Sequence, residues 1–310
     1  MRPAAPLTPH RALRLLASVL VVVLVLLLGG LGVKEQQGPT YHHYVAMGDS
    51  FTAAPYVPLT DVAYGCLRSS NNYPNRVAAN LHIDDLEDRS CTGAQTVDLY
   101  GRDQLTADGM SVPPQFNALS SSTDLVTVGI GANNGRLYAK LATVCRKMQQ
   151  ICPLYDQRDE LGAIVDLLQP ELVATLDRIQ ELAPDARVLL IGYPKLLPQR
   201  GDCARLPRMR PEDRATFRAM NMRLRIAQRD AAEESGVEFV DFYAESIGHD
   251  VCSQRPWVQG RVGSSRQGAA LHPLPAGQAA LARMITDGLR EDPPRTGEGA
   301  VEDATDEDGV

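Results

Sequence analysis

A serine and a histidine of this chain stand at positions from which they could act together on an ester. Ser50 follows a short apolar run that ends at Met47, within the tripeptide Gly48-Asp49-Ser50. A serine on the turn after a strand projects its hydroxyl into the crevice where open α/β sheets bind ligands. His272 follows a long loop and begins the last helical pattern. Because a histidine base turns a neighbouring hydroxyl into a nucleophile, the pair predicts acyl-transfer chemistry.

Two further positions could stabilise the negative charge that such a reaction develops. Asn133 follows the apolar run that ends at Ile130, so its amide is expected at the same edge of a parallel sheet as Ser50. Gly93 follows a weaker apolar run, and a glycine lets a backbone N–H approach the same point closely. Donors aimed at developing charge stabilise it, so Asn133 and Gly93 are candidates for binding an oxyanion.

Short apolar runs alternate with helical patterns from residue 44 onward, which is typical of a parallel sheet covered by helices on both faces. The runs at 125–130 and 188–191 do not alternate with charges, as expected of fully buried strands. The fold class is therefore predicted to be α/β. The expected strands are 44–47, 85–89, 125–130, 187–191 and 237–240, and the expected helices are 73–81, 134–147, 160–182, 211–235 and 275–290.

In this order the segments around Ser50, Gly93, Asn133 and His272 resemble the blocks of the SGNH, or GDSL, hydrolase family, over residues 44–289. The resemblance implies a three-layer flavodoxin-like sandwich with a five-stranded parallel sheet. It implies that Ser50 is the nucleophile and His272 the general base. It also implies that the Ser50 N–H, the Gly93 N–H and the Asn133 side chain bind the oxyanion. Residues 248–258 and 272–277 look like the disulfide-bearing secreted esterase and lipase branch of the family.

The sequence departs from the family at the residue that orients the histidine. The usual Asp-x-x-His pattern would place an aspartate at position 269, where this chain has Ala269. Some members of the similar branch use a backbone carbonyl at this spacing, so the Ala269 carbonyl is the first candidate for orienting His272. Asp250 and Asp241 are the alternatives. A Ser-His dyad remains competent, because the acid mainly holds the tautomer and stabilises the charge.

The two ends of the chain differ in composition from the middle. Residues 1–14 are basic, and residues 15–33 form an unbroken apolar or small stretch of about 28 Å if helical, close to the thickness of a bilayer core. We expect this stretch to be a single-pass anchor, with a cleaved secretory signal as the alternative. Either one exports a linker at 34–43 and a hydrolase domain at 44–290. Residues 291–310 are predicted to be a disordered acidic tail.

Six cysteines follow the apolar stretch, and their even number in an exported chain predicts three disulfides. Spacing alone leaves the connectivity open, and nearest-neighbour pairing along the chain is our expectation. Zinc is the weaker alternative because no Cys-x-x-Cys occurs. We therefore expect no metal site and no cofactor. The expected pairs are Cys66 with Cys91, Cys145 with Cys152, and Cys203 with Cys252.

Composition narrows the classes of function. A net charge of −7 argues against a nucleic-acid partner, which requires a basic face. The predicted function is a serine esterase or lipase that takes a small-molecule or lipid ester, is held at a membrane by its N-terminal segment and needs no obligate protein partner. The alternative within enzymes is an O-deacetylase or acyltransferase of envelope glycans or glycolipids. The alternative from another class is a catalytically idle envelope scaffold.

Overall fold

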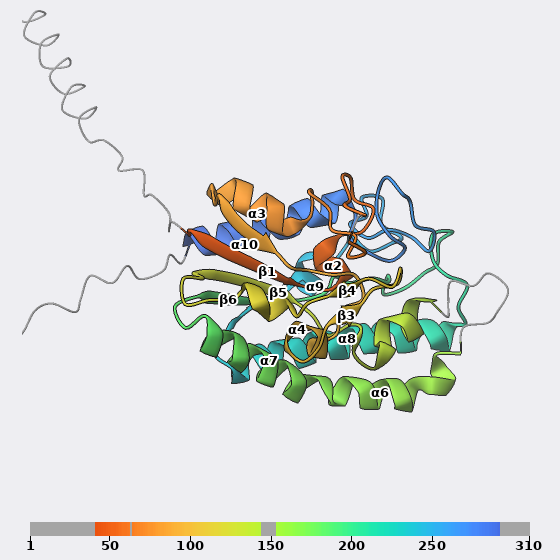
Figure 1. The fold of residues 1–310 in the computed structure, drawn as a ribbon. Coiled ribbons are helices and arrows are strands. Elements are labelled where there is room, and N and C mark those ends of the chain that lie inside the picture. Colours follow the sequence, from red (N-terminus) through yellow and green to blue (C-terminus); the bar gives the residue numbers. More distant parts are fainter. Residues whose placement is uncertain (1–40, 63, 144–152, 292–310) are drawn as a thin grey trace, which may run out of the picture. The chain divides into compact units, whose positions relative to one another are not determined.

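A five-stranded parallel sheet forms the centre of the protein in this computed structural model, which describes residues 41–62, 64–143 and 153–291 (Figure 1). The strand order is β2-β1-β5-β6-β7, which is the flavodoxin-like order 2-1-3-4-5 when the sheet's own strands are counted along the chain. Helices cover both faces, so the predicted α/β fold is confirmed. The strands are β1 (His43–Gly48), β2 (Asp85–Asp88), β5 (Leu125–Gly129), β6 (Arg187–Ile191) and β7 (Glu238–Val240).

The side chains of the central strands alternate between two hydrophobic cores. Along β1, Val45 and Met47 enter the core on one face, whereas Tyr44 and Ala46 enter the core on the other. Figure 1 shows α3 and α10 together on one side of the sheet and α6, α7 and α8 on the opposite side. These helices are α3 (Tyr73–Leu81), α10 (Pro275–Glu291), α6 (Arg158–Asp166), α7 (Leu168–Leu182) and α8 (Pro211–Glu234). A shorter helix, α4 (Thr96–Tyr100), precedes β5 in the chain.

Local signals explain where several helices begin and end. Asn72 accepts the backbone N–H of Asn75 and caps α3. Pro211 opens α8, where its missing N–H costs no hydrogen bond, and the helix ends before Gly236, whose φ is +66°. The predicted helix 160–182 is instead two helices that part at Leu167. Pro170 accounts for the break, because it has no N–H to continue the hydrogen-bond ladder.

The predicted helix at 134–147 is wrong in its described part. A 3₁₀ turn at Asn134–Arg136 is followed by one π-helical turn at Ala139–Thr143, and Gly135 within the first turn has a φ of +55°. The sequence analysis also missed elements too short to show a period. These are α2 (Ser50–Ala53), β3 (Gln104–Leu105), β4 (Ser111–Val112), the 3₁₀ turns at Gln115–Ala118 and Tyr155–Gln157, and α9 (Phe242–Glu245).

Two disulfides join the loops that extend beyond the carboxyl edge of the sheet. Cys66 pairs with Cys91, and Cys203 pairs with Cys252, as predicted. The first ties the loop after α2 to the segment that carries Gly93. Disulfides form and persist in oxidising compartments, so they favour a domain that folds outside the cytoplasm.

Several predictions concern residues outside the described ranges. They are the basic segment 1–14, the apolar stretch 15–33, most of the linker 34–43, the acidic tail from residue 292, and the pair Cys145 and Cys152. Within residues 41–62, 64–143 and 153–291, no helix has the length and apolar character needed to span a bilayer.

Candidate active site

The described structure brings Ser50 and His272 into direct contact across 222 positions of the chain. Ser50 is the first residue of α2, immediately after β1, and His272 lies at the end of the loop that precedes α10. The His272 Nε2 lies 2.8 Å from the Ser50 Oγ. Both side chains are nearly buried, with 4% and 8% of their surface exposed. This is the geometry of a hydroxyl and the base that would remove its proton.

The turn that presents Ser50 depends on Gly48 and Asp49. Gly48 has a φ of +145°, and a Cβ there would lie 2.4 Å from both the Gly129 carbonyl oxygen and the Thr52 hydroxyl, so only glycine fits. Asp49 caps α2 by accepting the backbone N–H of Phe51 at 2.8 Å. β1 therefore ends abruptly and the hydroxyl of the next residue is fixed at the sheet edge.

The hydrogen bond on the far side of the His272 ring defines its tautomer. Nδ1 lies 2.8 Å from the Ala270 carbonyl oxygen. A carbonyl only accepts, so the Nδ1 atom carries the proton and Nε2 is left to accept from the Ser50 hydroxyl. This is the tautomer that a general base requires.

The prediction that the Ala269 carbonyl orients the ring is wrong by one residue. The Ala269 carbonyl accepts the backbone N–H of His272 at 3.2 Å, whereas the ring contacts the carbonyl of Ala270. Leu271, between Ala270 and His272, has a φ of +58°. This left-handed residue makes a tight turn and brings the carbonyl two positions before the histidine back toward its ring.

The two carboxylates considered for the same role are engaged elsewhere. Asp241 forms an ion pair with Arg225 and caps α9. Asp250 accepts the backbone N–H of Cys252 at 2.9 Å, and so closes a turn beside a disulfide.

The segments carrying the oxyanion candidates converge on the end of β1. The Cys91 N–H donates to the Gly48 carbonyl at 2.9 Å, which places Gly93 two residues from that strand end. The Asn133 Nδ2 lies 3.1 Å from the Ala94 carbonyl oxygen and 3.4 Å from Asp49. Among the described residues, no acceptor is found for the backbone N–H of Ser50 or of Gly93, whose φ is +86°. The site therefore holds two open backbone donors and one amide donor.

Asn134 holds the Asn133 turn in place. Its Nδ2 donates to the Thr96 hydroxyl at 2.7 Å and to the Glu171 carboxylate, and its Oδ1 accepts the Thr96 N–H. These bonds attach the turn after β5 to α4 and α7.

Asp49 is a buried titratable group within this site. The Tyr193 hydroxyl donates to it at 2.6 Å and accepts the backbone N–H of Ala132 at 3.0 Å. Burial raises the pKa of Asp49 to about 7, because the charged carboxylate loses hydration; the hydrogen bonds from Tyr193 and Phe51 offset part of this rise.

We expect Asp49→Asn to change how stability depends on pH. The pKa of Asp49 is about 7 in the folded protein, compared with the ordinary value of 3.8 expected in the unfolded chain. Its contribution to stability is thus greatest below about pH 4 and is lost as the pH rises through about 7. Between about pH 4 and 7 the wild type should therefore lose free energy of unfolding relative to the variant. Above about pH 7 the difference between the two proteins should stay constant.

Urea denaturation of both proteins between about pH 4.5 and 8.5 measures this difference. Asp185→Asn, at an exposed position after α7, is the matched control and should run parallel to the wild type. A constant difference between Asp49→Asn and the wild type over the whole range would contradict the prediction.

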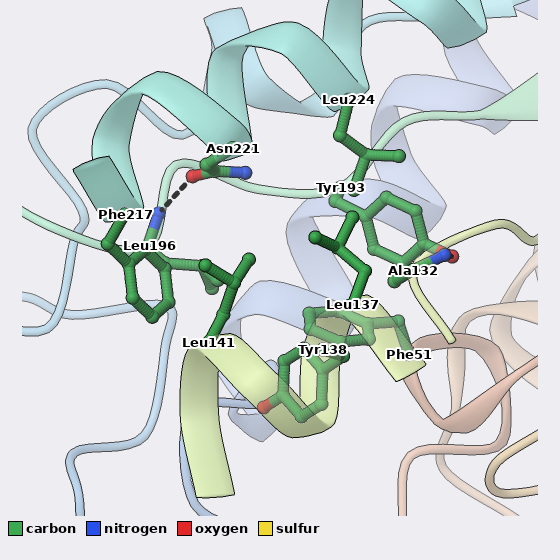
Figure 2. A pocket seen from close by; sticks show the side chains of 10 residues that line it. All are labelled: Phe51, Ala132, Leu137, Tyr138, Leu141, Tyr193, Leu196, Phe217, Asn221 and Leu224. Carbon is green, nitrogen blue, oxygen red and sulfur yellow. Dashed lines mark hydrogen bonds between the residues drawn. The ribbon is translucent and has the colours of Figure 1, made fainter. Parts of the chain in front are cut away.

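A small apolar cavity of about 20 Å³, room for roughly one water-sized group, adjoins the site. Figure 2 shows its side chains converging from the segment after β5, from the connection after β6 and from α8. Asn221 is the polar exception, and its amide is occupied by the backbone of Leu196 and Pro194. The aliphatic and phenyl lining includes Leu137, Leu141, Leu196, Phe217 and Leu224.

Phe51 and Tyr138 connect this cavity to the Ser-His pair. Both line the cavity, and both rings contact the His272 ring, with centroids 4.8 Å and 5.1 Å away. Phe51 also packs edge to face against Tyr138 and Tyr193. An apolar group that reached Ser50 would therefore find a continuous apolar surface beside it.

A second hollow, wide and open, lies next to the loop that carries the histidine. Its volume is about 650 Å³, and its lining is partly polar. Arg261, Ser264, Ser265 and Ala270 are among the residues that form it.

A serine and a histidine paired at the carboxyl edge of a parallel sheet place the protein among serine hydrolases with a three-layer α/β sandwich. Sequence comparison identifies the family: residues 46–280 match the GDSL-like lipase/acylhydrolase family, and the chain belongs to it. The family, fold and enzyme class predicted from the sequence are thereby confirmed, and the protein is a GDSL-type ester hydrolase.

Streptomyces proteins provide relatives in both sequence and structure. Lipase 2 of Streptomyces coelicolor is 34% identical over 263 residues, which cover 79% of this chain and 85% of that protein. The crystal structure of phospholipase A1 from Streptomyces albidoflavus gives a TM-score of 0.68 at 25% identity and covers 81% of this chain and 99% of its own. The extracellular lipase of Streptomyces rimosus gives 0.66 at 26% identity, with 80% and 99% covered.

Tyr138 and Tyr193 are site residues that the sequence analysis missed. Tyr193 follows β6 after one glycine, at the same sheet edge as Ser50, and this position was the available signal. Tyr138 lay within a predicted helix and gave no comparable signal.

Proposed function

We propose that Ser50 is the nucleophile and His272 the general base in the hydrolysis of carboxylic acyl esters. The observation that carries the proposal is the 2.8 Å contact between Ser50 Oγ and His272 Nε2, with the proton of the ring placed on Nδ1 by the Ala270 carbonyl. The predicted dyad fits this arrangement, with a backbone carbonyl in the place of the acid.

The reaction proceeds in two halves. Ser50 Oγ attacks the ester carbonyl carbon while Nε2 of His272 takes the hydroxyl proton. The carbonyl oxygen becomes negative and is bound by the N–H groups of Ser50 and Gly93 and by the Asn133 amide. The imidazolium then gives its proton to the departing alcohol oxygen, which leaves an acyl-serine. Water, deprotonated by the same ring, then attacks the acyl carbon. The bond between that carbon and Ser50 Oγ breaks, Oγ takes the proton from Nε2, and the acid leaves.

The substrate class follows from the two spaces beside the dyad. We assign the apolar side chains around the small cavity, among them Leu137, Phe217 and Leu224, to the acyl chain, which enters as they move apart, because burying methylene groups against them is favourable. The open hollow with Arg261 and Ser264 is assigned to the alcohol part of the ester. Together they favour lipid esters over acetylated glycans, and the names lipase and phospholipase A1 of the relatives agree with this choice.

Exposed apolar side chains on the surrounding loops fit the same substrate class. Leu59, Tyr64, Leu105 and Val262 expose from 63% to 77% of their surface. They belong to the loop after α2, to the β3-β4 hairpin and to the loop before His272. The first and third of these loops are joined by the hydrogen bond from the Ala269 N–H to the Pro55 carbonyl.

The direct test is hydrolysis of p-nitrophenyl esters from acetate to palmitate by the oxidised protein, combined with fluorophosphonate labelling. Turnover with preference for longer chains, and a label on the Ser50 peptide, are the expected results. Turnover of acetate alone would favour a deacetylase. A folded, disulfide-intact protein that neither turns over esters nor takes up the label would favour an idle scaffold.

Leu224→Phe should shorten the range of acyl chains accepted. Leu224 is a buried residue of α8 that lines the small cavity, and a larger ring there leaves the chain less room to enter between α8 and the segment after β5. We expect kcat/KM for palmitate to fall about 4- to 15-fold, from the loss of one to two methylene contacts at about 0.8 kcal/mol each. The value for acetate should stay within about twofold of wild type. Leu224→Met, which conserves volume, is the control, and equal losses for both esters would remove the cavity from the assignment.

We further propose that the chain is exported, with residues 15–33 as its membrane anchor and the hydrolase domain at 44–290 outside the cytoplasm. The disulfides Cys66–Cys91 and Cys203–Cys252 support export. A cleaved signal is the alternative, and the extracellular lipase among the relatives is a secreted precedent. Membrane fractionation and the mass of the mature N-terminus decide between the two.

A further inference from the structure

The hydroxyl of Tyr138 is surrounded by three polar atoms of the histidine loop. It lies 3.1 Å from the Ala270 carbonyl oxygen, 3.1 Å from the Leu271 carbonyl oxygen and 3.2 Å from Nδ1 of His272. Tyr138 comes from the segment after β5 and lies 134 positions before the histidine. The contact therefore links two separate parts of the site.

The backbone between Ala270 and His272 explains why one hydroxyl can reach both carbonyls. Leu271 is fully buried and has a φ of +58°, a conformation that a leucine rarely adopts. With Leu271 in this conformation, the carbonyls of Ala270 and Leu271 both come within hydrogen-bond distance of the Tyr138 oxygen. A hydrogen bond to them stabilises the turn that places the Ala270 carbonyl against the imidazole ring.

The distribution of protons follows from what each atom can donate. The two carbonyls only accept, so the Tyr138 hydroxyl gives its proton to them, shared between the two oxygens. Its lone pairs then remain for the Nδ1–H of His272. When Nε2 takes the proton of Ser50, the imidazolium has two neutral acceptors at Nδ1, the Ala270 carbonyl and the Tyr138 oxygen.

We propose that Tyr138 is the positioning residue for the general base, at the side of the ring where an aspartate is absent from this chain. The inference rests on the proposed function of His272. Tyr138 holds the Ala270 carbonyl in the direction of Nδ1 and supplies the second acceptor for the imidazolium. It acts through the histidine and does not touch the reacting carbonyl.

The position of Tyr138 is itself fixed. Its backbone N–H donates to the Ala132 carbonyl at 2.7 Å, and its ring packs edge to face on Phe51 with centroids 5.4 Å apart. Ala132 directly precedes Asn133, so one short segment places both an oxyanion donor and the group that orients the base. A shift of this segment would move the oxyanion donor and the Tyr138 hydroxyl together.

Tyr138→Phe tests the inference, because it removes only the hydroxyl and keeps the ring in the cavity. We expect kcat for p-nitrophenyl butyrate to fall about tenfold, the effect of one hydrogen bond that acts on the charged ring. KM should stay within about twofold, since the phenyl contacts remain. Tyr44→Phe is the matched control. It removes a buried hydroxyl that bonds Thr127 on the other face of the sheet, and its kcat should equal that of the wild type.

A spectroscopic readout separates positioning from stability. The Nδ1 proton of His272 is expected as a downfield ¹H resonance that is missing in His272→Ala, and it should move upfield in Tyr138→Phe. A lower melting temperature with unchanged kcat and an unchanged resonance would overturn the inference while leaving the proposed function intact. Wild-type turnover that does not depend on Ser50 would overturn the proposed function and this inference with it.

Discussion

Ser50→Ala is expected to reduce kcat for p-nitrophenyl butyrate by about 10⁶-fold, to the level left by binding and the oxyanion donors alone. The physical reason is the contact of 2.8 Å between the Ser50 Oγ and the His272 Nε2, through which the ring would take the hydroxyl proton. Without the oxygen, no acyl intermediate forms, and the ring can only activate water. The fold should persist, because alanine also fits the first turn of α2.

Two further variants make this prediction specific. Ser69→Ala removes another buried hydroxyl, which accepts the backbone N–H of Asn71, and should keep full activity. His272→Ala should lose about as much activity as Ser50→Ala, and the double variant should lose no more than either, since residues that act as one unit are not additive. Activity of Ser50→Ala within about tenfold of wild type would contradict the assignment of the nucleophile.

The sheet could be read from the sequence because its central strands are buried on both faces. The runs that became β5 and β6 are apolar and β-branched, and no helix pattern competes with them. Ser50 and Asn133 could be placed at one edge of the sheet because strand ends are recognisable in the sequence and parallel strands end at the same edge. The paired register of Gly48 with Gly129 shows why that reasoning worked: both turns leave the sheet at the same level.

The parts of the site that escaped prediction depend on backbone turns. Whether the carbonyl of Ala269 or of Ala270 faces the ring is decided by the left-handed conformation of Leu271, and a leucine gives no sequence signal for it. Tyr138 was hidden for a similar reason. Its segment has the composition of a helix but contains Gly135 with a φ of +55°, so the chain turns and delivers the tyrosine to the histidine loop.

Two tyrosines outside the family motifs therefore hold the segments around Ser50 and His272 in place by hydrogen bonds. Tyr193 donates to Asp49 and accepts the Ala132 N–H, and so supports the turn that leads to Asn133. Tyr138 binds the loop of the histidine. Phe51 packs between their rings and the imidazole. An aromatic cluster thus packs around the Ser50–His272 pair, at the side where the family pattern has an aspartate and this chain has Ala269.

Asn133→Ala is expected to lower kcat by about 10²- to 10³-fold, the usual cost of removing one oxyanion donor. The Asn133 side chain is half-buried and contacts the Ala94 carbonyl and Asp49, at 3.1 and 3.4 Å. The contact with Asp49 is long, so the Nδ2 hydrogen on that side can donate to an oxyanion without the loss of a strong hydrogen bond. KM should change little, since the donor acts on charge that is present only in the transition state.

The neighbouring asparagine provides the control, because the two amides have different partners. Asn134 is buried and bonds Thr96 and Glu171, so Asn134→Ala should mainly lower the free energy of unfolding, by about 1–3 kcal/mol. Asn133→Ala should instead unfold at nearly the urea concentration of the wild type. The measurement is kcat and the urea midpoint for both variants. An Asn133→Ala protein with wild-type kcat, or one whose loss of rate only follows a loss of stability, would remove Asn133 from the oxyanion hole. Ser50 and Gly93 would then remain as its two donors.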